Sequence, residues 1–481
     1  MTNTESTKEA SNVQQAVKPG LILAVVAVVQ FMVSLDLSVV NVGLPEIATG
    51  LGFSAVGLTW VIHAYALTFG GLLLLGGKLA DLFGRKQILV FGLALFAIAS
   101  LVGGFAQAPE HLVAARAAQG VGAAALAPAA LALLSATFPA GKERVKAFGI
   151  WSAMNAAGGA LGVLIGGVLT QYAGWRWVMF ISVPMAAIAL FMALRVHSTP
   201  PTARDGRPDI LGAALATAGM SLLVFGVVRT EQHGWGSSTT LTTLGIAAAM
   251  LVAFVYVEKT TRRDPLIRLG MLSNRSVAGA NIFNLVFGAT MASSFYFVSL
   301  YLQRVLDTSP ALTGVEFLPL AIGVVIGSVI AIKLGLTVPA RTLIVVGGLV
   351  TAIGFFWFGM IDSNGSFFTD AFGPSIVTAI GFGLCLGPTV STATVGVDPA
   401  ETGAASGLLS SSRQIGASLG LAALGTAAQV RTGPDPTPAA LTDGYAWGMT
   451  LGAILLVAAS VIALFVIPAV RPEPAKAAAA E

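Results

Sequence analysis

Long apolar runs separated by short polar segments make up nearly the whole chain. Most runs approach the roughly 20 residues that an α-helix needs to cross the hydrocarbon core of a bilayer. The connections are too short to hold a folded soluble domain. The pattern therefore predicts an all-α polytopic membrane protein with 14 transmembrane helices. The predicted spans are 20–44, 57–76, 88–106, 111–136, 145–170, 177–195, 209–229, 240–258, 277–304, 312–334, 340–361, 370–396, 404–430 and 444–468.

The composition agrees with this pattern. The chain is 56% hydrophobic and only 10% charged, whereas a soluble domain carries about 25% charged residues. A single cysteine, Cys385, excludes a disulfide framework within the chain and a cysteine-based zinc site. The net charge of +4 comes from the predicted loops and gives no reason to expect a nucleic-acid partner.

The positions of lysine and arginine orient the predicted helices. With the N-terminus in the cytoplasm, 20 of the 26 basic residues fall on inner segments, which is the bias typical of cytoplasmic loops. The other six lie on outer segments or within spans: Arg116, Arg176, Arg229, Arg304, Arg413 and Arg431. We therefore expect a multi-pass protein of the cytoplasmic membrane with both termini in the cytoplasm.

Two inner loops, 195–208 and 258–276, are longer than the others and enclose a pair of spans. This grouping predicts two six-helix bundles with an inserted two-helix hairpin. The predicted units are a cytoplasmic tail at 1–19, an N-terminal bundle at 20–195, the hairpin at 209–258, a C-terminal bundle at 277–468 and a disordered tail at 469–481.

A lone carboxylate, Asp36, lies in the apolar run from Leu21 to Leu44. Insertion scales put the cost of such a group at about 2.5–3.5 kcal/mol at a helix centre. A sequence retains it mostly where it handles ions, protons or a charged substrate. The alternative is a carboxylate that only caps or packs against a neighbouring helix.

The segment after the second span contains Gly77, Asp81, Gly84, Arg85 and Lys86. A tight loop between two helices needs glycine for close approach and positive φ. Asp81 can meet a helix N-terminus, while the two cations stay on the cytoplasmic side. The alternative is an ordinary charged turn. The full pattern, Gly-x-Leu-Ala-Asp-x-x-Gly-Arg-Lys, resembles the loop signature of the major facilitator superfamily, which implies a cytoplasmic gate here.

The fifth span carries glycines whose spacing lets another helix approach one face closely. They are Gly149, Gly158, Gly162, Gly166 and Gly167. The pattern is similar to the antiporter signature of the exporter branches of this superfamily, although generic glycine-mediated packing is the alternative. Val163 stands where that signature has a proline, so a kink-forming residue is missing.

Further motifs extend the resemblance over nearly the whole chain. The fourth span opens with a segment, Leu112–Ala124, that is similar to the superfamily motif in which a buried arginine, here Arg116, serves proton coupling. The segments Leu35–Pro45, Trp175–Trp177 and Arg413–Gly416 resemble the 14-helix drug:proton antiporter branch. The resemblance implies two bundles around a central cavity and proton-driven export of amphipathic organic compounds such as antibiotics. It also implies a monomer that needs only protons, substrate and lipid, with no cofactor.

Three polar side chains fall at one predicted depth. Asp36, His63 and Arg116 lie on helices that share a bundle in the superfamily fold, within roughly one helical turn in height. They could form a titratable cluster. His63 can equally be a hydrogen-bonded packing residue. Glu316, near the outer end of the tenth span, is either a substrate or proton site or a solvated vestibule residue.

Other function classes fit less well. A proton-coupled symporter or importer of a small metabolite would use the same fold, but the glycine pattern and the number of spans favour export. A membrane-embedded enzyme would need a nucleophile–base pair or a metal cluster, which 4 scattered histidines and 1 cysteine do not supply. A sensor would need a signalling domain to carry its output.

Overall fold

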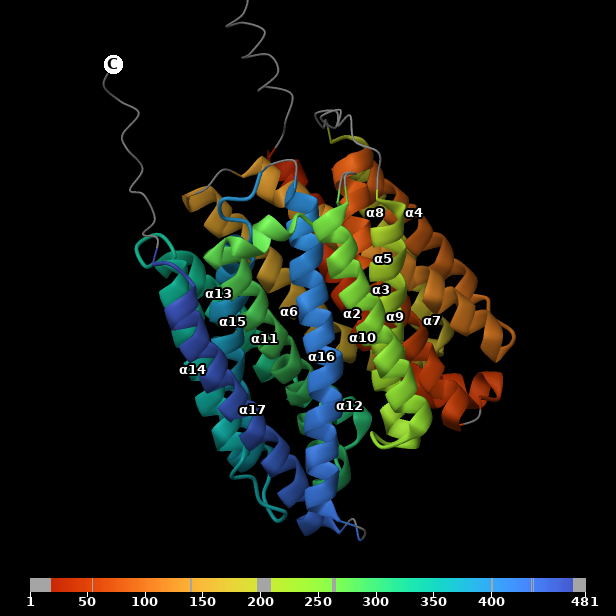
Figure 1. Cartoon of the computed structure of the whole chain (residues 1–481). Coiled ribbons are helices and arrows are strands. Elements are labelled where there is room, and N and C mark those ends of the chain that lie inside the picture. Colours follow the sequence, from red (N-terminus) through yellow and green to blue (C-terminus); the bar gives the residue numbers. More distant parts are fainter. Residues whose placement is uncertain are drawn as a thin grey trace, which may run out of the picture.

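The computed structural model describes residues 19–53, 55–138, 141–196, 209–261, 265–398, 401–433, 435 and 437–469. The predicted tails, up to residue 18 and from residue 470, lie outside the described residues, as does most of the loop at 195–208. The described chain consists of helices joined by short turns (Figure 1). The prediction of an all-α membrane protein is confirmed.

The N-terminal bundle comprises seven helices that account for six predicted spans, because the sixth span is broken at Ile181 into α7 and α8. Their bounds are α2 Pro19–Leu51, α3 Ala55–Phe83, α4 Arg85–Gly104, α5 Pro109–Thr137, α6 Lys142–Ala173, α7 Arg176–Phe180 and α8 Ser182–Leu194.

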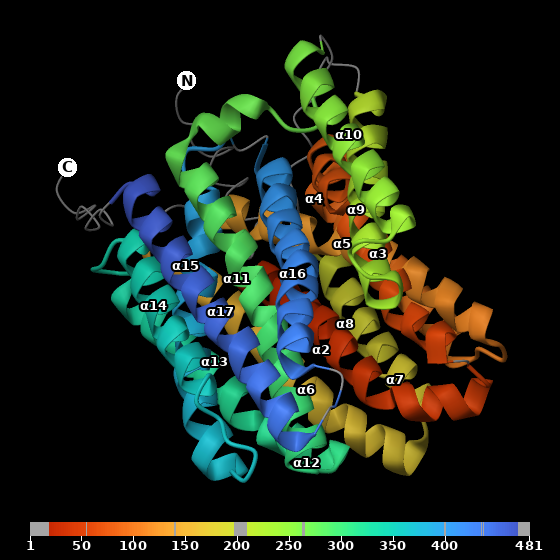
Figure 2. The same cartoon turned by 60° about the horizontal axis from the view of Figure 1, so that its bottom comes forward.

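The inserted hairpin consists of α9 (Ile210–His233) and α10 (Ser238–Thr260), which pack against each other. Asp209 caps α9 by accepting a hydrogen bond from the Gly212 amide. The hairpin lies beside α3 (Figure 2), and α9 also contacts α16 of the C-terminal bundle. The insertion therefore touches both halves of the protein.

The C-terminal bundle is more interrupted. The tenth span is divided at Phe317, and the ninth and twelfth spans each include a short π-helical turn, η2 or η3. The elements are η1 Leu269–Ser273, α11 Arg275–Leu300, η2 Tyr301–Val305, α12 Pro310–Glu316, α13 Leu318–Leu334, α14 Ala340–Phe358, η3 Phe367–Ala371, α15 Phe372–Ala393, α16 Thr402–Thr432 and α17 Pro438–Val466.

Within the described residues, 13 helical segments are long and apolar enough to cross a membrane. The predicted span that does not meet this criterion is α16, because polar residues such as Ser410, Arg413 and Gln414 interrupt its apolar sequence. It nevertheless runs for 31 residues alongside α11 and α17. The fold is therefore consistent with 14 membrane helices.

Several predicted spans are shorter than the helices that contain them. Helix α3 continues to Phe83 and α2 to Leu51, beyond the predicted ends at 76 and 44. Hydropathy detects only the apolar part of a helix, whereas backbone hydrogen bonds extend it into polar sequence. The predicted loop from Gly77 to Lys86 is consequently wrong: its first seven residues are the last turns of α3. Gly84 alone separates α3 from α4, with φ +97°.

Candidate proton-coupling site and bundle interface

Asp36 is completely buried within α2, with 0% of its side chain exposed. Leu35 and Leu37 flank this position, and side chains of neighbouring helices enclose the carboxylate. A buried charge of this kind is stable only if it is paired and hydrogen-bonded. The groups that surround Asp36 therefore define its chemistry.

Arg116 of α5 pairs with Asp36, with its Nη1 atom 2.7 Å from Oδ2. The other carboxylate oxygen, Oδ1, accepts hydrogen bonds from Gln119 Nε2 at 3.1 Å and from Ser182 Oγ at 3.2 Å. The three donors come from α5 and α8. The structure thus pairs two of the three members of the predicted cluster, and it satisfies both carboxylate oxygens.

The guanidinium of Arg116 is held from several directions. Its Nε atom donates to the Val61 carbonyl oxygen at 3.0 Å, and Nη1 also donates to Gln119 Oε1 at 2.8 Å. Its Cζ atom lies 4.5 Å from the centroid of the Tyr65 ring. Since Val61 and Tyr65 belong to α3, the ion pair joins four helices of the N-terminal bundle.

Sequence reasoning missed part of this network. Gln119 donates to Asp36 and to Ser100 Oγ, and Ser100 in turn donates to the Phe96 carbonyl oxygen. Gln119 follows Arg116 by three residues, so the helical period places both side chains on one face. That spacing could have indicated Gln119. Ser182 carries no comparable signal, because only packing brings α8 beside α2.

His63 is directed differently from the other two members of the predicted cluster. Val61 and Tyr65, which face Arg116, are each two positions from His63, so its side chain lies roughly 160° around α3 from either of them. Its ring lies edge-on to Trp60, with centroids 6.3 Å apart. Trp60 in turn contacts Phe225 of the hairpin helix α9. A transport role for His63 stays a prediction.

Glu316 is the last residue of α12. Its side chain is half-buried, and its Oε2 atom is buried without a hydrogen-bond partner among the described residues. It therefore differs from a fully solvated vestibule carboxylate. Whether Glu316 binds substrate or protons remains a prediction.

Asp81 joins the two bundles at the end predicted to face the cytoplasm. Its Oδ1 and Oδ2 atoms accept hydrogen bonds from the backbone amides of Gly403 and Ala404, at 3.0 and 2.9 Å. These amides belong to the first turn of α16, where unpaired N–H groups and the helix dipole favour a negative charge. Gly77 adds to the contact, because a Cβ there would collide with the Gly403 carbonyl oxygen.

The cations of the same segment have separate environments. Lys86 donates from Nζ to the Leu194 carbonyl oxygen at 3.1 Å, at the end of α8. Arg85 begins α4 directly after Gly84. The gate residues therefore extend from the bundle interface at Asp81 to the N-terminal bundle's own surface at Lys86.

Three of the predicted glycines form a close contact between α6 and α2. A Cβ at Gly162 would lie 2.8 Å from the Leu35 carbonyl oxygen, and one at Gly166 would lie 3.0 Å from Val39 Cα. Gly158 approaches the Phe31 carbonyl oxygen in the same way. These positions recur every four residues, so they share one face of α6.

The other two glycines do not belong to this face, which corrects the prediction. Gly149 lies nine residues before Gly158, roughly 180° around the helix, and packs against Ile332 of α13 in the other bundle. A Cβ added at Gly167 would meet no atom within 4 Å. Val163, which stands in place of the signature proline, faces Gly314 of α12, and α6 continues through it without a break.

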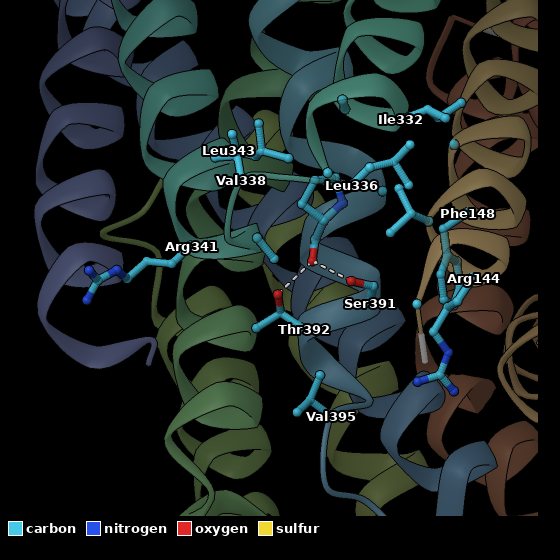
Figure 3. Close-up of a pocket in the computed structure, with 18 of the residues that line it drawn as sticks. Arg144, Phe148, Ile332, Leu336, Val338, Arg341, Leu343, Ser391, Thr392 and Val395 are labelled. Carbon is cyan, nitrogen blue, oxygen red and sulfur yellow. Dashed lines mark hydrogen bonds between the residues drawn. The ribbon is translucent and has the colours of Figure 1, made fainter. Parts of the chain in front are cut away.

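A cavity of about 410 Å³ lies between α6 and the helices α13–α15 (Figure 3). Arg144 and Phe148 line it from the α6 side, and Arg341 lies on the opposite side. Ser391 and Thr392 both donate to the Pro388 carbonyl oxygen. The described lining residues include the cations Lys142, Arg144 and Arg341, and none of them is acidic.

Comparison with known sequences is consistent with this arrangement. The family described as Major Facilitator Superfamily matches residues 26–421. The chain is 39% identical over 445 residues to the cephamycin export protein of Amycolatopsis lactamdurans, covering 92% of this chain and 91% of that one. It is 40% identical over 437 residues to the puromycin resistance protein of Streptomyces alboniger, covering 89% and 86%.

Solved structures show the same fold at low sequence identity. The chain resembles a human organic anion transporter with a TM-score of 0.64 at 13% identity, covering 93% of this chain and 99% of that one. It resembles a proton:xylose symporter with a TM-score of 0.63 at 15% identity, covering 94% and 96%. At such identities the likeness concerns the arrangement of helices alone.

Proposed function

Because this chain belongs to the Major Facilitator Superfamily, we propose that it exports amphipathic organic compounds, antibiotics among them, in exchange for protons. The similarity to an antibiotic export protein and to a resistance protein, over about nine tenths of each chain, supports export. The proton gradient would drive the transport cycle, and the cycle would need no cofactor. The chain would act as a monomer in the cytoplasmic membrane, with both termini in the cytoplasm.

The buried carboxylate of Asp36 is the observation that carries proton coupling. Ionised, it balances the charge of Arg116 and accepts two further hydrogen bonds. A proton bound from outside would neutralise the carboxylate and leave Arg116 without its counter-charge. Since the pair joins α2 to α5 and contacts α3 and α8, this change of charge would alter the packing of the bundle that lines one side of the transport path.

The contact of Asp81 with α16 would serve as the cytoplasmic gate. It links an N-terminal helix to a C-terminal one, so the two bundles cannot separate at this end while both hydrogen bonds remain. Alternating access requires the bundles to rock about a central site. Opening toward the cytoplasm would break this contact, and closing would restore it.

The test uses cells that express the chain and a panel of labelled antibiotics. We expect lower accumulation than in cells without the protein, and we expect a protonophore to abolish the difference. Asp36→Asn should also abolish it. Asp435→Asn, the same chemical change at an exposed position, should have no effect. Export at the wild-type rate and with unchanged pH dependence by Asp36→Asn would rule Asp36 out as the coupling site.

Inverted vesicles distinguish export from import. With the cytoplasmic face outward, an exporter accumulates substrate inside the vesicle when the interior is acidic. Loss of preloaded substrate under the same gradient would favour a symporter that imports a small metabolite.

A further inference from the structure

Arg413 lies in the middle of α16, where its side chain is partly buried. It follows Gly403 by ten residues, which places it about 15 Å deeper along the helix, near the centre of a hydrocarbon core about 30 Å thick. Its guanidinium makes no hydrogen bond or ion pair with any residue that the structure describes. Its neighbour is Trp151 of α6, whose ring centroid lies 5.8 Å from Cζ.

This environment contrasts with that of Arg116. Arg116 has a carboxylate, a carbonyl oxygen and an amide oxygen as acceptors, whereas Arg413 has an aromatic ring. A cation–π contact contributes about 0.5–2 kcal/mol. An arginine at a membrane helix centre costs about 2.5–3.5 kcal/mol. The contact alone does not offset this cost, and none of the described acidic residues forms an ion pair with Arg413.

Trp151 also lacks an acceptor. Its side chain is 1% exposed, and Nε1 has no hydrogen-bond partner among the described residues. An unsatisfied buried donor costs about 1–3 kcal/mol. Arg413 belongs to the C-terminal bundle and Trp151 to the N-terminal bundle. Two donors without acceptors thus meet across the interface that must open and close during transport.

The charge of the nearby cavity has the same sign. Lys142, Arg144 and Arg341 line it, and none of the described lining residues is acidic. Figure 3 shows Arg144 and Arg341 on opposite sides of the cavity. Phe148, which also lines it, precedes Trp151 by nearly one turn on the same side of α6. The cavity at the predicted cytoplasmic end is therefore electropositive, and it lies about one turn of α6 away from Trp151.

We infer that Arg413 and Trp151 form the binding site for the negatively charged group of the substrate, which is an amphipathic organic anion. This inference rests on the proposed export function and names its substrate class. The planar guanidinium can donate two parallel hydrogen bonds to a carboxylate or sulfonate. The indole contributes a donor and an apolar face for the organic body of the substrate. An anion bound here would touch both bundles at once.

Binding to the purified full chain in lipid nanodiscs tests the inference without a proton gradient. The probe is anilinonaphthalene sulfonate, and the matched neutral probe is phenylnaphthylamine, which has the same rings without the sulfonate. Fluorescence is recorded with empty nanodiscs subtracted. Arg413→Gln should weaken binding of the sulfonate by about 10- to 100-fold, the loss expected for hydrogen bonds to a charged group. Binding of the neutral probe should remain unchanged.

Three further variants test the geometry of the guanidinium, the hydrogen-bond donor of the indole and the position of the cation. Arg413→Lys keeps the positive charge but removes the planar guanidinium that can donate two parallel hydrogen bonds. It should therefore retain part of the preference for the sulfonate. Trp151→Phe keeps a ring but removes the donor, and it should weaken the sulfonate more than the neutral probe. Arg341→Gln removes a cation of the cavity and should have a smaller effect than Arg413→Gln.

Several results would overturn the inference. They are a wild-type protein that does not prefer the sulfonate, an Arg413→Gln variant that loses both probes equally or neither, and a larger loss in Arg341→Gln than in Arg413→Gln. The accumulation assay separates this failure from failure of the proposed function. Protonophore-sensitive export without a preference for anions would support the proposed export function and refute the anion site. Binding of anions at Arg413 without export would support the site and refute the export function.

Discussion

Replacing Asp81 with alanine should release the contact between α3 and α16 and favour conformations that are open at the end predicted to face the cytoplasm. The carboxylate accepts two backbone amides of the first turn of α16, at 3.0 and 2.9 Å. Alanine removes both acceptors and the negative charge at the helix N-terminus. Because these groups belong to different bundles, their energy stabilises only conformations in which the bundles meet here.

The size of the effect follows from these two hydrogen bonds. A hydrogen bond to a charged group contributes about 1.5–3 kcal/mol. Asp81 is only partly buried, and solvent screening places each bond at the low end of this range. Together they contribute roughly 3 kcal/mol. Since about 1.4 kcal/mol corresponds to a factor of ten, the closed-to-open equilibrium should shift by about 100-fold.

Spin labels at Phe83 and Leu272 would report the shift, with Cys385→Ser to remove the native thiol. Both positions are exposed, at 60% and 41%, and they belong to the N-terminal bundle and to the segment that begins the C-terminal bundle. Electron paramagnetic resonance should show a longer distance population in Asp81→Ala. Turnover should fall while substrate affinity stays near wild type, because the contact lies at a moving interface and not at the central site.

Two further variants test the reasoning. Asp81→Asn keeps one acceptor oxygen without the charge and should give an intermediate shift. Gly77→Ala removes no hydrogen bond, but its methyl group would press against the Gly403 carbonyl oxygen and should also favour opening. An unchanged distance distribution in Asp81→Ala would refute the gate. Equal loss of binding and turnover would indicate misfolding instead.

Other predictions concern the interior of the N-terminal bundle. Arg116→Ala leaves the buried carboxylate of Asp36 without its cation, at a cost of about 3–5 kcal/mol if it stays ionised, so Asp36 should hold its proton. Drug-dependent proton release in proteoliposomes should therefore fall at neutral pH and recover partly at alkaline pH. An equal loss at every pH would contradict the coupling. Gly162→Val should lower the melting temperature by disturbing the α2–α6 contact, at about 1–3 kcal/mol, whereas Gly167→Val should not. His63→Gln should keep proton-coupled export, measured in the same liposomes, if its packing against Trp60 is its main role.

Much of the membrane architecture could be predicted from the sequence because the bilayer acts on each segment separately. Every span must satisfy its own backbone hydrogen bonds in lipid, so length and hydropathy indicate a helix without knowledge of its neighbours. The cost of burying a charge in the membrane also acts on each residue separately, so it indicated that Asp36 and Arg116 each need a partner. Gly84 was identified as a turn glycine because one left-handed residue suffices to reverse the chain, although the loop around it is shorter than predicted.

The partners of these residues depended on distant parts of the chain. Asp81 meets the amide of Gly403, 322 residues away, and nothing in the local pattern specifies α16 as its partner. Ser182 reaches Asp36 only because α8 packs beside α2. His63 shares the predicted depth of Asp36, but the rotation of α3 directs it away from Arg116, on the side where Trp60 contacts Phe225 of α9. Depth along a helix follows from sequence, whereas rotation about the helix axis follows from packing.

The sequence by itself determined that the chain is an all-helical membrane protein, which segments cross the bilayer, and which charges within them need partners. It did so because the free energy of transfer into lipid, favourable for apolar side chains and costly for charged ones, belongs to each residue wherever its helix lies. The tertiary structure decided which faces meet: α2 against the Gly158–Gly166 face of α6, Asp81 on α16, and Arg413 opposite Trp151. These contacts depend on how two bundles and a hairpin pack together, and many sequences with the same hydropathy could pack otherwise.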